Sequence, residues 1–134
     1  MYILKNTLPL SSINIFPKPN SLMPLIQVNT SIKSVVDKDL LQQEISKMVA
    51  DLTGKPESYV MTMIQSDTQM TFAGSDEPCC FIKLKSIGSL NPSSMSKSLC
   101  DLIASKTNIE TDRIYVEFID VKASNWGFNS STFG

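Results

Sequence analysis

Apolar residues along this chain recur first at a spacing of two and then at a spacing of 3.6, and that order occurs twice. Leu25 to Asn29 alternates in character as a short strand does. The next stretch places apolar residues on one helical face, at Leu40, Leu41, Ile45, Met48, Val49 and Leu52. Asp37 is a candidate cap for this helix, and Gly54 closes it where a left-handed backbone costs least. We therefore predict a strand followed by a helix.

Strand patterns return after Gly54. They cover three segments: Tyr59 to Gln65, Gln69 to Phe72, and Cys80 to Ile87. Asn91 and Pro92 then supply a cap and the residue favoured at the first helical position. A second apolar stripe runs to about Thr107, through Met95, Leu99, Leu102 and Ile103. Ile114 to Val121 has the pattern of a final strand.

Strand, helix and strand thus occur twice in succession, which indicates an α+β domain made of two βαβ repeats. Two such units predict one sheet with both helices on the same face. The other face would be open, yet Tyr59 to Gln65 carries apolar residues on both of its sides. Association of subunits would cover those residues. The pattern predicts an oligomer without fixing its number of subunits.

Residues 1–22 follow neither period. They contain Lys5 and Lys18, three prolines and no acidic residue, and polar residues or prolines interrupt each apolar stretch. This composition is a poor match for a secretory leader. We predict a disordered extension, arising either from a misassigned start or as a processed leader, before one domain at residues 23–134.

Composition narrows the classes of function. A length of 134 residues with 42% hydrophobic content suits one domain. A formal net charge of -1 and the lack of any run of Lys or Arg exclude a nucleic-acid binder and a polybasic membrane binder. No stretch approaches the roughly 18 apolar residues of a spanning helix. Three cysteines, two of them adjacent at Cys79 and Cys80, form no disulfide framework, so we expect reduced thiols and a cytoplasmic origin.

The chain contains no histidine, the residue that titrates nearest neutral pH and most often binds metals. A Ser-His or Cys-His nucleophilic site is therefore excluded, and we expect neither a metal nor another cofactor. Acid-base chemistry must come from a perturbed carboxylate, lysine, tyrosine or cysteine, or from a free terminal amine.

Eight short segments carry a further signal. In order, they are Met23-Pro24, Val28-Asn29-Thr30, Thr53-Gly54-Lys55-Pro56, Phe72-Ala73-Gly74-Ser75, Glu77-Pro78-Cys79, Ser86-Ile87-Gly88, Asp112-Arg113-Ile114-Tyr115-Val116 and Asn129-Ser130-Ser131-Thr132-Phe133. At nearly unchanged spacing over residues 23–134, they resemble the macrophage migration inhibitory factor family. The resemblance implies a homotrimer with active sites at its subunit boundaries. It also implies a keto-enol tautomerase of the phenylpyruvate or dopachrome type.

Through the resemblance, Pro24 becomes the candidate base. A secondary amine at a chain terminus accepts a proton, whereas the same nitrogen inside a peptide bond does not. An α-amino group has a pKa of about 7.7–8.0, and burial and a nearby cation both lower it. By position alone, Pro24 would be an ordinary residue at the edge of a strand. A chain that keeps Met1 lacks the base, so we expect a start at Met23 or processing before Pro24.

Lys55, Ile87 and Tyr115 match further site positions of the family. The Lys55 ammonium would hold a substrate oxygen and stabilise developing negative charge, and the Ile87 N–H would bind substrate. Tyr115 would reach the site of a neighbouring subunit as a third catalytic residue. Each also has an ordinary interpretation: a lysine that answers a helix dipole, a core residue at a strand end, and an aromatic ring packed on a sheet.

Four aromatic residues would surround the pocket: Tyr59, Trp126, Phe128 and Phe133. The alternative is a tail that seals the trimer interface. Relative to vertebrate members, Trp126 and Phe128 move aromatic bulk by two positions, which would change the shape of the pocket. Glu117 replaces an asparagine, so its carboxylate would either hold the pKa of the proline amine higher or repel an anionic substrate. Ile82 occupies the second cysteine position of the family's thiol motif, so we expect no dithiol oxidoreductase activity.

Two functions follow from the resemblance. In the first, the chain is an enzyme that acts on a small aromatic keto acid through Pro24, Lys55 and the Ile87 N–H. In the second, the trimer is a cytokine-like signal that leaves the cell without a signal peptide and binds a cell-surface receptor, with vestigial chemistry in its pocket. We predict the enzyme, with the signalling protein as the alternative.

Overall fold

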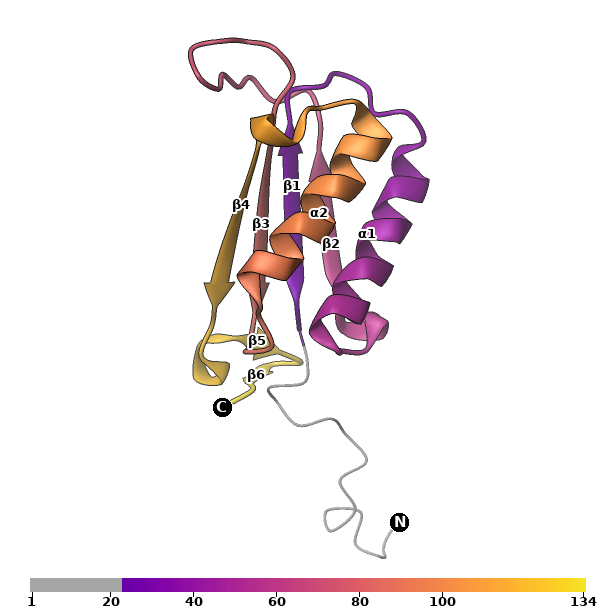
Figure 1. Ribbon diagram of the computed structural model, residues 1–134. Helices are drawn as coiled ribbons and strands as arrows, with labels where there is room; N and C mark the ends of the chain where they lie inside the picture. Colours follow the sequence, from indigo (N-terminus) through magenta and orange to yellow (C-terminus); the bar gives the residue numbers. More distant parts are fainter. Residues whose placement is uncertain (1–22) are drawn as a thin grey trace, which may run out of the picture.

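The computed structural model describes residues 23–134. It contains a four-stranded sheet: β1 at Leu25–Thr30, β2 at Met61–Gln65, β3 at Cys80–Ser86 and β4 at Ile114–Asp120. Two helices, α1 at Lys38–Thr53 and α2 at Pro92–Thr107, lie on one face of this sheet (Figure 1). The α+β architecture predicted from the two βαβ units is confirmed.

The strands lie in the order β2-β1-β3-β4. β1 is parallel to β2 and β3 is parallel to β4, as helical crossovers require, while β1 and β3 are antiparallel. The β1-β3 ladder pairs Leu25 with Lys85 and Thr30 with Cys80. One end of the sheet therefore collects the start of β1 and the ends of both β3 and β4.

Alternation along β1 and β3 directs apolar side chains toward the helices. The central members of this layer, at most 3% exposed, are Ile26, Val28, Ile82 and Leu84. They pack against buried helix residues: Leu41, Ile45, Val49, Met95, Leu99 and Ile103. The predicted helical stripes are thus confirmed except at Leu40, which is 45% exposed because it lies outside the face formed by Leu41, Ile45 and Val49.

The helix ends agree only partly with the predicted caps. Gly54 ends α1 in the left-handed conformation at φ 69°, as predicted. Asp37 and Asn91 occupy the N-cap positions, but neither side chain makes a capping hydrogen bond. Asp37 is itself left-handed at φ 53°, whereas a side-chain cap requires an extended backbone. The helices therefore depend on packing more than on their N-terminal caps.

The segment between β2 and β3 differs from the prediction. The strand expected at Gln69 to Phe72 is wrong, because Phe72 forms only one isolated bridge, with Ser75. Both residues between them have positive φ, so the chain turns back on itself before a ladder can extend. β2 also begins later than predicted, since a 3₁₀ turn occupies Glu57–Tyr59.

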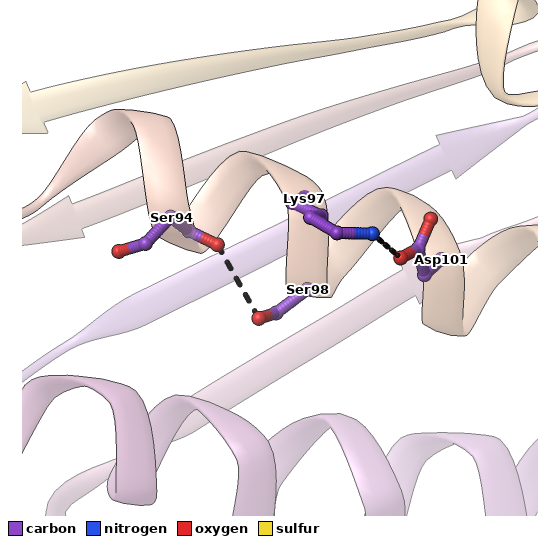
Figure 2. A network of polar contacts seen from close by, with 4 residues as sticks. All are labelled: Ser94, Lys97, Ser98 and Asp101. Carbon is purple, nitrogen blue, oxygen red and sulfur yellow. Dashed lines mark hydrogen bonds and ion pairs between the residues drawn. The ribbon is translucent and has the colours of Figure 1, made fainter.

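The exposed face of α2 is polar. Lys97 and Asp101 form an ion pair one turn apart at 2.7 Å, and the Ser98 hydroxyl donates to the Ser94 carbonyl at 3.3 Å (Figure 2). Both charged side chains are exposed, so solvent screens their attraction and the pair contributes little to stability. Charge on this face can therefore be changed with little effect on the core.

Across residues 23–134, no helix or strand covers the opposite face of the sheet (Figure 1). Large apolar side chains remain exposed there, with Met61 at 56%, Met63 at 47% and Tyr115 at 64%. Such a patch indicates an interaction surface. We expect subunits to associate through this open face.

A short hairpin of β5 at Gly127–Phe128 and β6 at Ser131–Thr132 lies below the sheet in Figure 1. The pattern along the sequence did not predict it, because strands of two residues have no measurable period. Its turn depends on positive φ at Asn129 and Ser130. No helix in the described part of the chain is long and apolar enough to cross a bilayer.

Candidate active site

Segments far apart in the sequence meet at one end of the sheet. Pro24 precedes β1, Lys55 follows the end of α1, Ile87 follows β3, and the β5-β6 hairpin follows β4 (Figure 1). The antiparallel β1-β3 ladder and the parallel β3-β4 ladder impose this convergence. Topology therefore gathers predicted site residues from both halves of the chain.

Pro24 is less than 2% exposed and continues the buried side of β1, on which Ile26 and Val28 follow it. Its carbonyl accepts a hydrogen bond from the Met61 N–H at 3.0 Å, which ties it to the start of β2. Proline donates no N–H, so its position just before the strand costs no ladder hydrogen bond. An amine formed at this nitrogen would be shielded from water, and shielding lowers the pKa of an amine.

Lys55 is only 4% exposed, and its ammonium donates a hydrogen bond of 2.7 Å to the Ile87 carbonyl. Its N–H donates to the Ala50 carbonyl at 3.1 Å, within the turn that Gly54 makes at the end of α1. Burial lowers the pKa of Lys55, and the attraction of Asp120 partly offsets that effect. A lysine whose only role was to interact with the helix dipole would stay in solvent. The ordinary interpretation therefore leaves the burial of this side chain unexplained.

Three of the predicted aromatic residues contact one another at this end of the chain. The rings of Tyr59 and Phe128 meet edge to face with 5.8 Å between centroids, and Phe128 stacks on Phe133 at 5.6 Å. Trp126 joins them through the backbone, since its carbonyl accepts the Phe133 N–H at 3.1 Å. Phe128 is still 43% exposed. The cluster is therefore an apolar wall with an open side.

Tyr115 and Glu117 do not belong to the group of residues at the Pro24 end of the sheet. Both belong to β4 and face the open side of the sheet, and Tyr115 lies near the end opposite to Pro24. The Tyr115 ring instead contacts Phe72, edge to face, at 4.8 Å. Glu117 pairs with Lys83 in the middle of the ladder. A single chain does not bring these two residues to Pro24, so only a second chain packed on the open face could do so.

Three polar residues at the Pro24 end were not among the predicted site residues. Asp120 ends β4, pairs with Ser86, and accepts the Gly88 N–H on Oδ1 at 2.9 Å. The Ser86 side chain is fully buried, and its hydroxyl has no hydrogen-bond partner within residues 23–134. Lys85 lines a hollow of about 350 Å³ together with Trp126. The hydrophobic pattern assigned these positions only to strands, and although Ser86 belongs to one of the segments that carry the family resemblance, no site role was predicted for it.

The cysteine pair is not part of this end of the molecule. Cys79 and Cys80 lie at the other end of β3 and are at most 2% exposed. Burial raises the pKa of the Cys80 thiol to about 12, so it stays protonated and is a poor nucleophile. Among the described residues, no three His, Cys, Asp or Glu side chains gather in a way that could hold a metal ion.

Comparisons with known proteins agree on one family. The family model described as Macrophage migration inhibitory factor (MIF) matches residues 23–134. The macrophage migration inhibitory factor of Meriones unguiculatus is 41% identical over 115 residues, which cover 83% of this chain and 99% of that protein. The crystal structure of a macrophage migration inhibitory factor homologue from Prochlorococcus marinus has a TM-score of 0.78 and 46% identity, covering 82% of this chain and 99% of its own. The macrophage migration inhibitory factor from Trichinella spiralis has a TM-score of 0.75 and 33% identity, with 81% and 98% covered.

Proposed function

The chain belongs to the macrophage migration inhibitory factor family, and on that premise we propose that it is a keto-enol tautomerase of small aromatic substrates. The substrates are of the phenylpyruvate or dopachrome kind. The active form is a homotrimer in which Pro24 is the first residue of each chain and its amine is the general base.

In this reaction the amine of Pro24 takes a proton from the carbon beside the keto group. The electron pair of the broken C–H bond forms a C=C bond, and the keto oxygen takes up negative charge. The Lys55 ammonium stabilises that charge, while the Ile87 N–H holds a second substrate oxygen. The proton then passes from the amine to the keto oxygen, so the product is the enol and the base is regenerated.

The burial of the Lys55 ammonium, at the same end of the sheet as the buried Pro24, is the observation that carries the proposal. Burying a cation is unfavourable, and groups with pKa values displaced by burial gather at catalytic sites. The rings of Tyr59, Phe128 and Phe133 offer flat apolar surfaces against which an aromatic substrate can pack. A charged donor, a shielded terminus and an aromatic wall together suit an aromatic keto acid.

The open face of the sheet, whose exposed Met61 and Met63 need a partner, supports association of subunits, and the family resemblance supports three of them. In that assembly, Tyr115 and Glu117 reach the Pro24 end of a neighbouring chain. Tyr115 then donates to substrate, and the Glu117 carboxylate disfavours substrates with additional negative charge. Each site is incomplete without its neighbour.

The first experiment determines which residue begins the chain. Intact mass and N-terminal sequencing of the protein from its native source identify the terminus. A recombinant chain started at Met23, whose methionine is normally removed before proline, should then convert phenylpyruvate, and a chain that keeps Met1 should not. Pro24→Gly in the shorter chain should lower the rate by about 10²-fold or more. The proposal fails if the shorter chain, folded and assembled, turns over no faster than Pro24→Gly.

The family name itself favours a second candidate, since it describes an effect on macrophage migration. In this alternative the trimer binds a cell-surface receptor and the pocket chemistry is not used. Pro24→Gly separates the two functions: it should abolish turnover, while a receptor-mediated effect on cell migration should survive it. Loss of both effects in a correctly folded variant would tie the signal to the catalytic site.

A further inference from the structure

A row of three residues crosses the helix-facing side of the sheet at the Pro24 end. The antiparallel ladder pairs Leu25 with Lys85, so the next residues outward, Pro24 and Ser86, are neighbours. The parallel ladder then pairs Ser86 with Asp120. Pro24 and Ser86 are both buried, whereas Asp120 lies at the exposed edge. The last residue of β4 is thus two strands away from the proposed base.

We propose that Asp120 is a positioning residue of this site, which fixes the turn after β3 and places a negative charge within electrostatic reach of the Lys55 ammonium. The inference rests on the proposed tautomerase function, because Lys55 is the group on which Asp120 acts. Asp120 itself touches neither Pro24 nor substrate in this mechanism.

The hydrogen bonds around the turn give Asp120 its mechanical role. Asp120 Oδ1 accepts the Gly88 N–H at 2.9 Å. The residue before Gly88 is Ile87, whose carbonyl holds the Lys55 ammonium at 2.7 Å. Gly88 has a φ of 71°, so the chain bends sharply at the point where Asp120 holds it. The position of the carbonyl that holds the ammonium therefore depends on the contact with Asp120.

A backbone contact supports the same link between β4 and the turn. The Val121 N–H donates to the Ser86 carbonyl at 2.9 Å, directly beside the contact that Asp120 makes with Gly88. The end of β4 thus holds the residue before Ile87 and the residue after it. A side chain at position 120 that could not accept a hydrogen bond would leave only the first of these two links.

Charge gives Asp120 its second role. Burial disfavours the charged form of Lys55, and Asp120 is the carboxylate whose attraction favours it. Lys85, the nearby cation of β3, faces the open side of the sheet, because it alternates with the buried Leu84 and Ser86. Asp120 is exposed, so solvent screens its attraction and the effect is modest. Even a modest effect matters at a pH where part of the Lys55 population is neutral.

Two substitutions separate the roles. Asp120→Asn keeps an oxygen that can accept the Gly88 N–H but removes the charge, and Asp120→Ala removes both. Asp101→Asn is the matched control, because it removes the same charge from the exposed ion pair on α2 (Figure 2). NMR titration of the Lys55 Nζ signal in the full chain reports on the ammonium directly. In Asp120→Asn, Lys55 should titrate at a lower pH than in the wild-type chain. In Asp101→Asn, Lys55 should titrate at the same pH as in the wild-type chain.

Kinetics on the chain that begins at Pro24 give the second readout. Asp120→Asn should lower kcat for phenylpyruvate by about two- to fivefold on the alkaline side of the pH profile, the range expected for one exposed charge. Asp120→Ala should in addition raise KM, because the turn that carries the Ile87 N–H, which holds a substrate oxygen, is released. A residue with only a structural role would lower the amount of folded enzyme without moving the alkaline limb.

An unchanged Lys55 titration in Asp120→Asn, together with an unchanged alkaline limb, would overturn the proposal. A wild-type chain without turnover would instead refute the tautomerase function. The Lys55 titration does not depend on turnover, so it would still decide whether Asp120 acts on the ammonium.

Discussion

Replacing Lys55 with methionine tests whether this lysine is catalytic or structural. Methionine keeps an unbranched apolar stem of similar length and removes the ammonium. The change deletes the 2.7 Å hydrogen bond to the Ile87 carbonyl, and it also removes a cation from a position that is only 4% exposed. These two consequences have opposite effects on stability.

The magnitudes nearly cancel. A hydrogen bond from a charged donor contributes about 1.5–3 kcal/mol, which the variant loses. Burying the cation costs several kcal/mol, roughly the same amount, and the variant recovers that cost. The pKa of Lys55 is lowered, which means that burial outweighs the attraction of Asp120. We therefore expect the free energy of unfolding at pH 7 to change by less than about 1 kcal/mol.

The same pKa makes the stability of the wild-type chain depend on pH. The folded-state pKa of Lys55 lies below the value of 10.5 for an unperturbed lysine. Between the two values the unfolded chain binds more protons than the folded chain, so wild-type stability from this group rises with pH through that window. Below the window the full cost of the buried charge is present. Lys55→Met lacks this rise. The free energy of unfolding of the wild-type chain should therefore increase relative to that of the variant as the pH increases toward 10.5.

Turnover should respond very differently from stability. Loss of one fixed donor to the developing oxyanion should lower kcat by about 10²- to 10³-fold. Urea unfolding followed by circular dichroism measures stability, and phenylpyruvate conversion measures activity. Lys47→Met, which changes an exposed lysine of α1, serves as the control. If Lys55→Met loses about 3 kcal/mol or more of stability but keeps its turnover, the lysine is structural and our reasoning is wrong.

Three further changes test other parts of the molecule. Gly54→Ala should lower the free energy of unfolding, measured in urea, by about 1 kcal/mol; φ is 69° and no atom lies within 4 Å of the added Cβ, so only the backbone conformation is penalised. Met63→Lys should keep the circular dichroism spectrum and reduce the mass in light scattering to that of one chain; an unchanged mass would place the subunit interface elsewhere. Iodoacetamide should modify Cys100 slowly and leave Cys80 unmodified until urea is added, because burial raises the pKa of both thiols, that of Cys80 to about 12. Rapid labelling of Cys80 in the native protein, detected by mass spectrometry, would contradict this.

The long elements could be predicted because their apolar residues repeat over several turns or pairs. The second helix ends at Thr107 as predicted, and β1 extends the predicted strand by one residue. The strand expected at Gln69 to Phe72 failed for a physical reason: local preference for an extended chain does not supply a partner strand, and Phe72 pairs only with Ser75. The β5-β6 hairpin was missed because its strands are too short to show alternation.

The candidate site was much harder to predict than the fold. The hydrophobic pattern assigned Pro24 to a strand edge and Lys55 to a helix end, and only the family resemblance gave them chemistry. Asp120 was missed because its position depends on the register that pairs it with Ser86, and register between distant strands is not visible in either segment alone. Tyr115 shows a further limit, since its proposed site lies on another chain.

The ordinary pKa values of the two amines at this end determine which of them acts as the base. A lysine side chain begins at 10.5, whereas an α-amino group begins at about 7.7–8.0. An amine freed at Pro24 would share a poorly solvated end of the sheet with the Lys55 ammonium, and two cations placed there favour the loss of one proton. The group with the lower starting value loses it first, so Pro24 becomes the base and Lys55, which the Asp120 carboxylate attracts, remains the charged donor. In a chain that continues before Pro24, this nitrogen is an amide and the same fold holds a donor without a base. Cleavage of a single peptide bond therefore determines whether the proposed site can turn over substrate.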